Sequence, residues 1–204
     1  MALVKLNNRG VRSATSFGSI TGLGSMVFIK KVTASSSATV SFVDGTSDVV
    51  LDNTYKEYLF TFKNIHPETT EDFMWQCNAA GGSGYNETIT STTFETYNAE
   101  SGGTPGVGYD AGRDQAQGTS FQPLANNIQN DSDSGGAGFL RLFNPSSTVF
   151  VKHFIGTKTY MNGTQTQTIY SAGYVNTTSA IDEVQFKFET GDIDTGDICL
   201  YGIN

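Results

Sequence analysis

The fold is decided by Glu183-Val184-Gln185-Phe186-Lys187-Phe188 and, after a turn, by Ile198-Cys199-Leu200-Tyr201-Gly202-Ile203. In the first stretch polar and apolar residues alternate, which is the period-two pattern of a strand with one buried face. Residues 190–196 lie between the two stretches and combine Gly191 and Gly196 with Asp and Thr, as turns do. We therefore expect a closing hairpin on the core of an all-β domain.

The same alternation recurs along the chain, with turn residues between the segments. No segment has a sustained 3.6-residue period, which argues against long helices. The pattern predicts about ten strands, the number and spacing of a single antiparallel β-sandwich of jelly-roll type. Besides 183–189 and 197–203, the expected strands are 26–33, 38–43, 57–65, 73–78, 86–97, 138–143, 148–155 and 164–175.

Composition supports one compact β domain. The 204 residues are 37% hydrophobic, and 14 Phe and 9 Tyr supply large buried areas per residue. The 23 Gly and only 4 Pro are typical of many short strands joined by tight turns. We expect Trp75, Phe60, Phe62, Phe186 and Phe188 to face one another across the core.

Two segments depart from the strand rhythm. Residues 1–25 are rich in Ser, Gly and Thr and too short to offset their ordering entropy by burial on their own, so we expect an extended N-terminal attachment arm before a sandwich of residues 26–204. Residues 98–136 contain glycine and aspartate runs, and we expect a long loop inserted in the sandwich. Loops of this length are uncommon and tend to form contacts.

Interface candidates come from these two segments. Aromatic residues and arginine supply most of the anchoring energy of protein interfaces. The alternative for the loop residues is that they fold over their own sandwich. The candidates are Leu3, Val4, Leu6 and Arg9 in the arm and Tyr109, Arg113, Gln115 and Phe121 in the loop.

Two aspartate-rich loops are candidate calcium sites, because calcium takes six to eight oxygen ligands. Both lack the bidentate Glu that closes a twelve-residue calcium loop, and Asp is also a common turn residue. The candidates are Asp131 and Asp133 in one loop and Asp192, Asp194 and Asp197 in the other. No cofactor motif and no catalytic motif stands out.

Charge and cysteine content limit the function classes. A net charge of −8 argues against a partner bound through a phosphate backbone, so we expect no nucleic acid. Neither a signal peptide nor a run of about 20 apolar residues is visible. Cys77 and Cys199 are expected to be small buried hydrophobes, with a disulfide as the alternative.

Three further segments carry a resemblance: Met1-Ala2-Leu3-Val4-Lys5-Leu6-Asn7-Asn8-Arg9-Gly10, the stretch 142–154 beginning Leu-Phe-Asn-Pro, and Ser179-Ala180-Ile181 with Leu200-Tyr201-Gly202-Ile203. They are similar to the arm, central strand pair and closing hairpin of small β-rich structural proteins of tailed bacteriophages of marine bacteria, cyanophages among them. The resemblance implies a virion component made in the host cytoplasm and carries over no active site.

The expected function is a non-enzymatic structural protein on the virion surface, either a decoration or accessory subunit or a tail-fibre subunit that contacts host surface glycans. Expected partners are other virion proteins and further copies of the chain, for example in a trimer. The chain has no heptad or repeat pattern for a fibre shaft, which favours decoration. A glycan-active enzyme is the third class, and it would need two carboxylates across a cleft.

Overall fold

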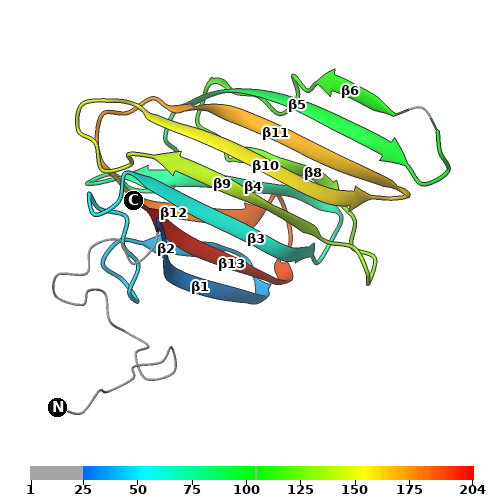
Figure 1. The fold of residues 1–204 in the computed structure, drawn as a ribbon, viewed down its shortest axis with the longest axis horizontal. Helices are drawn as coiled ribbons and strands as arrows, with labels where there is room; N and C mark the ends of the chain where they lie inside the picture. Colours follow the sequence, from blue (N-terminus) through cyan, green and yellow to red (C-terminus); the bar gives the residue numbers. More distant parts are fainter. Residues whose placement is uncertain (1–24, 104) are drawn as a thin grey trace, which may run out of the picture.

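The computed structural model describes residues 25–103 and 105–204, which form two antiparallel β-sheets with no helix in this part of the chain. The two sheets lie in two layers with the apolar core between them (Figure 1). This confirms the expected all-β sandwich; a jelly-roll connectivity stays a prediction. The predicted arm, with Leu3, Val4, Leu6 and Arg9, lies outside the described residues apart from Ser25.

The larger sheet has nine strands in the order β1-β13-β3-β9-β10-β11-β5-β6, with β7 also paired to β5. Its strands are β1 (Met26–Ser37), β3 (Glu57–Pro67), β5 (Ile89–Ala99), β6 (Gly106–Tyr109), β7 (Ala116–Gly118), β9 (Gly136–Phe143), β10 (Lys152–Asn162), β11 (Gln165–Val175) and β13 (Ile193–Ile203). The smaller sheet has the order β2-β12-β4-β8. Its strands are β2 (Val40–Val43), β4 (Glu71–Ala79), β8 (Gln122–Ile128) and β12 (Ile181–Phe188).

The predicted closing hairpin is wrong. β12 pairs with β2 and β4 in the four-stranded sheet, whereas β13 pairs with β1 and β3 in the nine-stranded sheet. The chain therefore crosses from one layer to the other between Phe188 and Ile193. Alternation shows that one face of each strand is buried, but two strands that face each other across a core alternate in the same way as two that pair edge to edge.

The core is built from the predicted aromatic residues. Phe186 of β12 packs edge-on against Phe60 and Phe62 of β3, with ring centroids 5.3 and 5.1 Å apart. The ring centroids of Trp75 on β4 and Phe154 on β10 are 4.9 Å apart. Each contact joins one sheet to the other, and Phe188 is buried in the same cluster. The predicted inward faces are confirmed.

The predicted long loop, residues 98–136, contains strands β6, β7 and β8. β6 pairs with residues 94–97 through its backbone, which needs no large side chains and so tolerates Gly106 and Gly108. β8 is the edge strand of the smaller sheet, where Pro123 costs no ladder hydrogen bond on its open side. The segment is therefore partly built into the two sheets, and its glycine and proline residues kept these short edge strands from being predicted.

The two cysteines are both free and lie in different sheets. Cys77 is buried on β4, as predicted, and burial raises the pKa of its thiol. Cys199 is only partly buried, because it alternates with the core residues Ile198 and Leu200 on β13. The prediction of a buried residue is wrong for Cys199. No helix capable of crossing a membrane occurs in the described part of the chain.

Candidate interaction surfaces

The outward face of the nine-stranded sheet, which we call the outer face, lies opposite the core, and no other strand layer of the described residues covers it (Figure 1). Its residues alternate with the buried ones along each strand. On β10, for example, Lys152, Phe154 and Gly156 are buried whereas His153 and Ile155 are exposed. The outer face therefore consists of every second strand residue, the one whose side chain points away from the core.

An aromatic row lies on this face at the edge formed by β11, β5 and β6. Strand register places Phe94 of β5 between Tyr109 of β6 and Tyr170 of β11. The Phe94 and Tyr170 rings stack at 4.8 Å with an interplanar angle of 10°. Phe94 is 44% exposed and Tyr109 is 62% exposed. Aromatic side chains of the kind usually found in a core are thus exposed to solvent at neighbouring positions.

A second aromatic pair lies at the far edge of the same face. Phe28 of β1 and Tyr201 of β13 are register partners with ring centroids 5.6 Å apart in an edge-on arrangement. Leu59 is the register partner of Tyr201 on the next strand, and Ile155 lies further along the same row. Phe28 is 57% exposed. The row is therefore apolar from Phe28 to Leu59 and again at Ile155, with Arg141 between Leu59 and Ile155.

The outer face carries few charges. Its outward-facing charged strand residues are Lys31, Glu57, Lys63, Arg141 and Asp197. Both carboxylates are paired, Glu57 with Arg141 at 3.0 Å and Asp197 with Lys31 at 3.3 Å. A hydrogen bond from the Thr33 hydroxyl lowers the pKa of Asp197. In a chain of net charge −8 this face is close to neutral, so the excess acid lies elsewhere.

The predicted loop interface divides into two parts. Tyr109 lies in the aromatic row, and its hydroxyl donates to Asp114, a hydrogen bond that raises the pKa of Tyr109. Arg113 instead turns onto its own domain, where Nη1 is 2.9 Å from Asp110 and Nε is 3.4 Å from Asp72.

Gln115 and Phe121 also contact their own domain. Gln115 donates from its backbone to Ser91 and from its side chain to the Ser120 carbonyl. Phe121 packs near Tyr85, with ring centroids 6.4 Å apart. Gln115, Phe121 and Arg113 thus fit the alternative to an interface, namely a loop folded over its own sandwich.

Sequence reasoning missed Phe28, Phe94, Tyr170 and Tyr201 as surface residues. Each occupies an alternating position in an expected strand, where an aromatic residue reads as core. The available signal was local: Phe94 is flanked by outward-facing Thr92 and Thr96, a sequence more polar than that of the core strands.

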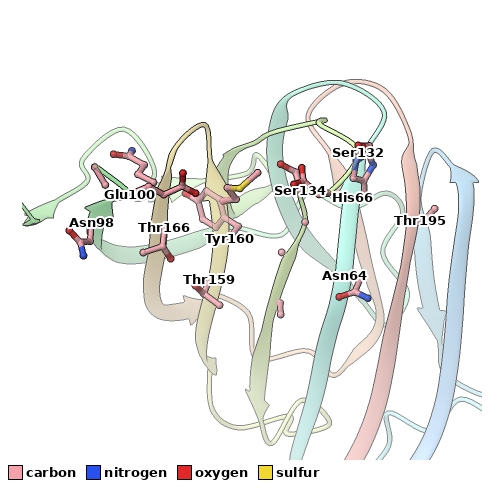
Figure 2. A pocket seen from close by; sticks show the side chains of 17 residues that line it. Asn64, His66, Asn98, Glu100, Ser132, Ser134, Thr159, Tyr160, Thr166 and Thr195 are labelled. Atoms are coloured by element: carbon pink, nitrogen blue, oxygen red, sulfur yellow. The ribbon is translucent and has the colours of Figure 1, made fainter. Parts of the chain in front are cut away.

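A polar groove of about 780 Å³ lies at one end of the sandwich (Figure 2). It is formed where β3, β5 and β10 end and where β9, β11 and β13 begin. Its lining includes amides, hydroxyls and carboxylates but no Lys or Arg. The polar side chains that line it are Asn64, His66, Asn98, Glu100, Ser132, Asp133, Ser134, Thr159, Tyr160, Gln165, Thr166 and Thr195.

His66 holds two loops together beside this groove. Its Nε2 is 3.1 Å from the Asp131 carbonyl oxygen, and its Nδ1 is 3.8 Å from the Asp194 carboxylate. Ser134 lines the groove at 8% exposure, and its buried Oγ has no hydrogen-bond partner. Tyr160 accepts a hydrogen bond from the Asn126 backbone, and burial raises the pKa of Tyr160.

The five calcium candidates do not form one ligand set. Asp197 binds Thr33 and Lys31 on the outer face, whereas Asp194 accepts from Ser36 and faces His66. Asp131 and Asp133 are exposed in the loop before β9, and Asp192 is held through its backbone by Glu68. Across residues 25–103 and 105–204, no three His, Cys, Asp or Glu side chains are grouped to hold a metal ion.

Comparisons of this chain with protein-family models, with curated proteins and with solved structures find no match.

Proposed function

We propose that this chain is a non-enzymatic structural subunit of a virion surface and that it joins neighbouring subunits through its outer face. The observation that supports the proposal is the nearly neutral, aromatic outer face on an otherwise acidic domain. Cores of protein interfaces are depleted of charge and enriched in Tyr and Phe. Contiguous apolar patches on soluble proteins commonly mark such contacts.

Symmetric self-association is the simplest use of this face. Most oligomers of one chain are closed and symmetric, and a two-fold contact uses the same patch on both copies. The aromatic row and the Phe28–Tyr201 pair lie at opposite edges of one sheet, so a partner that covers the face would contact both. A decoration or accessory subunit would use this contact to join its neighbours on the particle.

Sedimentation velocity of the full chain tests this contact. The double variant Phe94→Ser, Tyr109→Ser should shift the wild-type oligomer toward monomer, because it removes two exposed rings and leaves the core intact. Phe150→Ser is the matched control: Phe150 is 67% exposed but lies in the connection before β10, off the outer face. Equal oligomerisation of the double variant and the wild type would contradict the proposal.

Virion membership is tested separately, by quantitative mass spectrometry of purified phage particles. Hundreds of copies per particle would indicate a head-surface subunit, and a small multiple of three or six would indicate a tail fibre. Absence of the chain from particles would overturn the virion assignment without affecting the outer-face contact.

A receptor-binding role is the second candidate, and the same face favours it. Phe94 and Tyr170 lie among threonine hydroxyls on β5, β10 and β11, and aromatic rings beside hydroxyls suit a sugar ring. On this alternative the chain would remain monomeric at the outer face. Host surface polysaccharide would then broaden the aromatic NMR signals of the wild type but not those of Phe94→Ser, Tyr109→Ser.

A further inference from the structure

The polar groove at the end of the sandwich holds polar side chains that the fold itself does not use. Asn64, Asn98 and Gln165 line it, and none of their side-chain amides makes a hydrogen bond within residues 25–103 and 105–204. The buried Ser134 Oγ, at the same groove, also has no partner in that part of the chain. Each amide supplies both donors and an acceptor. The groove therefore has hydrogen-bonding groups that are open to a ligand.

The composition of the lining limits the class of that ligand. It contains no Lys or Arg, the residues that bind phosphate, sulfate and carboxylate groups. It contains no Leu, Ile, Val or Phe either, so it lacks the apolar pockets in which a bound peptide places its side chains. Metal-ligating side chains are not grouped in threes anywhere in the described residues. A ligand rich in neutral hydroxyls, each of which donates and accepts, matches this lining.

Two carboxylates add acceptors for such hydroxyls. Glu100 directly follows β5 and Asp133 lies in the loop before β9, and both are exposed at the groove. A carboxylate accepts hydrogen bonds at two oxygens, and its bonds are stronger than those between neutral groups. The volume of about 780 Å³ lies in the usual range for small-molecule sites. The groove is therefore suited to a sugar ring, which carries hydroxyls around its edge.

The groove opens onto the outer face. Asn98 of β5 and Thr166 of β11 are register partners, and both line the groove (Figure 2). The next outward residues along these two strands are Thr96 and Thr168, again register partners, and the stacked rings of the aromatic row follow. The ring on β11 lies four residues beyond Thr166, or about 13 Å along the strand. A band of hydroxyls therefore joins the groove to the aromatic row.

We propose that the polar groove binds one end of a neutral oligosaccharide, whose following sugar units lie along β5 and β11 toward the Phe94–Tyr170 stack. The amides and carboxylates of the groove hold the hydroxyls of the end unit, and the aromatic rings cover the apolar face of a later sugar ring. Only the part of the site on the outer face rests on the receptor-binding role given above as the second candidate function. The groove itself is a separate binding site for the end of the ligand.

A glycan array probed with the full chain tests the ligand class. Neutral oligosaccharides should be bound and acidic ones should not, because the groove has carboxylates and no cation. Binding should change little between about 0.1 M and 1 M salt, although the Debye length falls from about 10 to 3 Å, since a neutral ligand forms no ion pair. Binding of acidic oligosaccharides alone, or of none, would overturn the proposal.

Isothermal titration calorimetry then locates the ligand, with a hexasaccharide and a disaccharide of the neutral series that the array identifies. The double variant Asn98→Ala, Gln165→Ala should weaken the binding of both about tenfold, because it removes hydrogen bonds to the end unit. The matched control Asn53→Ala, Gln185→Ala removes the same two amide types outside the groove and the outer face, and it should bind both as the wild type does. Equal melting temperatures of the two double variants would show that the fold is retained.

The variant Phe94→Ser, Tyr109→Ser separates the two parts of the site. It should weaken the binding of the hexasaccharide and leave that of the disaccharide unchanged. Unchanged binding of both ligands by Asn98→Ala, Gln165→Ala would overturn the groove site and leave the receptor-binding role of the outer face intact. Unchanged hexasaccharide binding by Phe94→Ser, Tyr109→Ser would instead overturn the outer part of the site, and with it that role, and leave the groove site intact.

Discussion

At the scale of single residues, the core is decided by aromatic side chains that reach from one sheet to the other. Phe186 contacts Phe42, Phe60, Phe62 and Phe73, which come from both layers. Because partners surround the Phe186 ring, a shift of one neighbouring side chain could not fill the cavity that its removal would leave.

Phe186→Ala should therefore lower the free energy of unfolding by about 3–5 kcal/mol, the usual cost of emptying a buried aromatic site. Phe150→Ala serves as the control and should change it by less than about 0.5 kcal/mol, because Phe150 is exposed. Urea unfolding followed by tryptophan fluorescence measures both. A loss below 1 kcal/mol for Phe186→Ala would show that the site is not packed as described.

Lys158 is the least expected residue of the core. Its side chain is fully buried, its Nζ has no hydrogen-bond partner, and the amine lies 3.7 Å from the centroid of the Phe73 ring. Burial holds the pKa of Lys158 well below its ordinary value of 10.5. In the folded state the amine is therefore neutral at pH values where the unfolded chain binds a proton.

Because the unfolded state binds more protons, Lys158 makes stability rise with pH up to about 10.5, and its cost is greatest at low pH. Lys158→Met should raise the free energy of unfolding at pH 7 by about 1–3 kcal/mol, since it removes an unsatisfied buried donor. The gain should shrink as the pH is raised toward 10. Lys187→Met is the control, because Lys187 lies near the Phe121 ring but is only partly buried. A gain that does not vary with pH would contradict a neutral buried amine.

At the scale of strands, pairing depends on close backbone approach at certain glycines. A Cβ at Gly173 of β11 would lie 2.3 Å from the Thr90 carbonyl oxygen of β5, whereas a Cβ at Gly108 of β6 would meet no atom within 4 Å. Both glycines lie in strands that pair with β5. A side chain therefore has no room at Gly173 but has room at Gly108.

Gly173→Ala should destabilise the protein by about 1–3 kcal/mol, the usual cost of overpacking, because the clash is with backbone that cannot rotate away. Gly108→Ala should be neutral or slightly stabilising, since alanine loses less entropy on folding than glycine. Thermal unfolding of the two variants measures the difference. Equal melting temperatures would mean that β5 and β11 can separate at Gly173 without cost.

At the scale of the whole molecule, the domain and the arm are expected to be separable. The buried cluster within the described residues draws on both sheets and runs from Ala34 to Leu200. Folding should therefore depend on the sandwich, and the arm should act in assembly.

Deletion of residues 2–24 should leave the far-ultraviolet circular dichroism spectrum and the melting temperature nearly unchanged while assembly with other subunits is reduced. Full-length protein with Arg9→Glu and Arg12→Glu provides the control, because it keeps the length of the arm and changes only its charge. A truncated chain that unfolds would show that the arm belongs to the fold, and a chain that assembles normally would show that the arm is dispensable.

The candidate surfaces could be predicted only in part from the sequence. Tyr109, predicted as an interface residue, is exposed, whereas Arg113 pairs with Asp72 and Asp110 of its own domain. An arginine in a glycine-rich segment looks the same whether its partner lies in the same chain or in another. The groove draws residues from six strands and their connections, so no local pattern indicates it.

The sequence by itself determined the fold class, most of the strands and the inward direction of Phe60, Trp75 and Phe186, because alternation records which side of a strand is buried. Only the tertiary structure decided that β12 and β13 belong to different sheets and that Phe94 faces solvent while Phe186 faces the core. The physical reason is that burial depends on whether a second layer covers a strand face. The four-stranded sheet is smaller than the nine-stranded sheet. Strands with the same alternation of polar and apolar residues can therefore have their apolar face either covered by the other sheet or open to solvent.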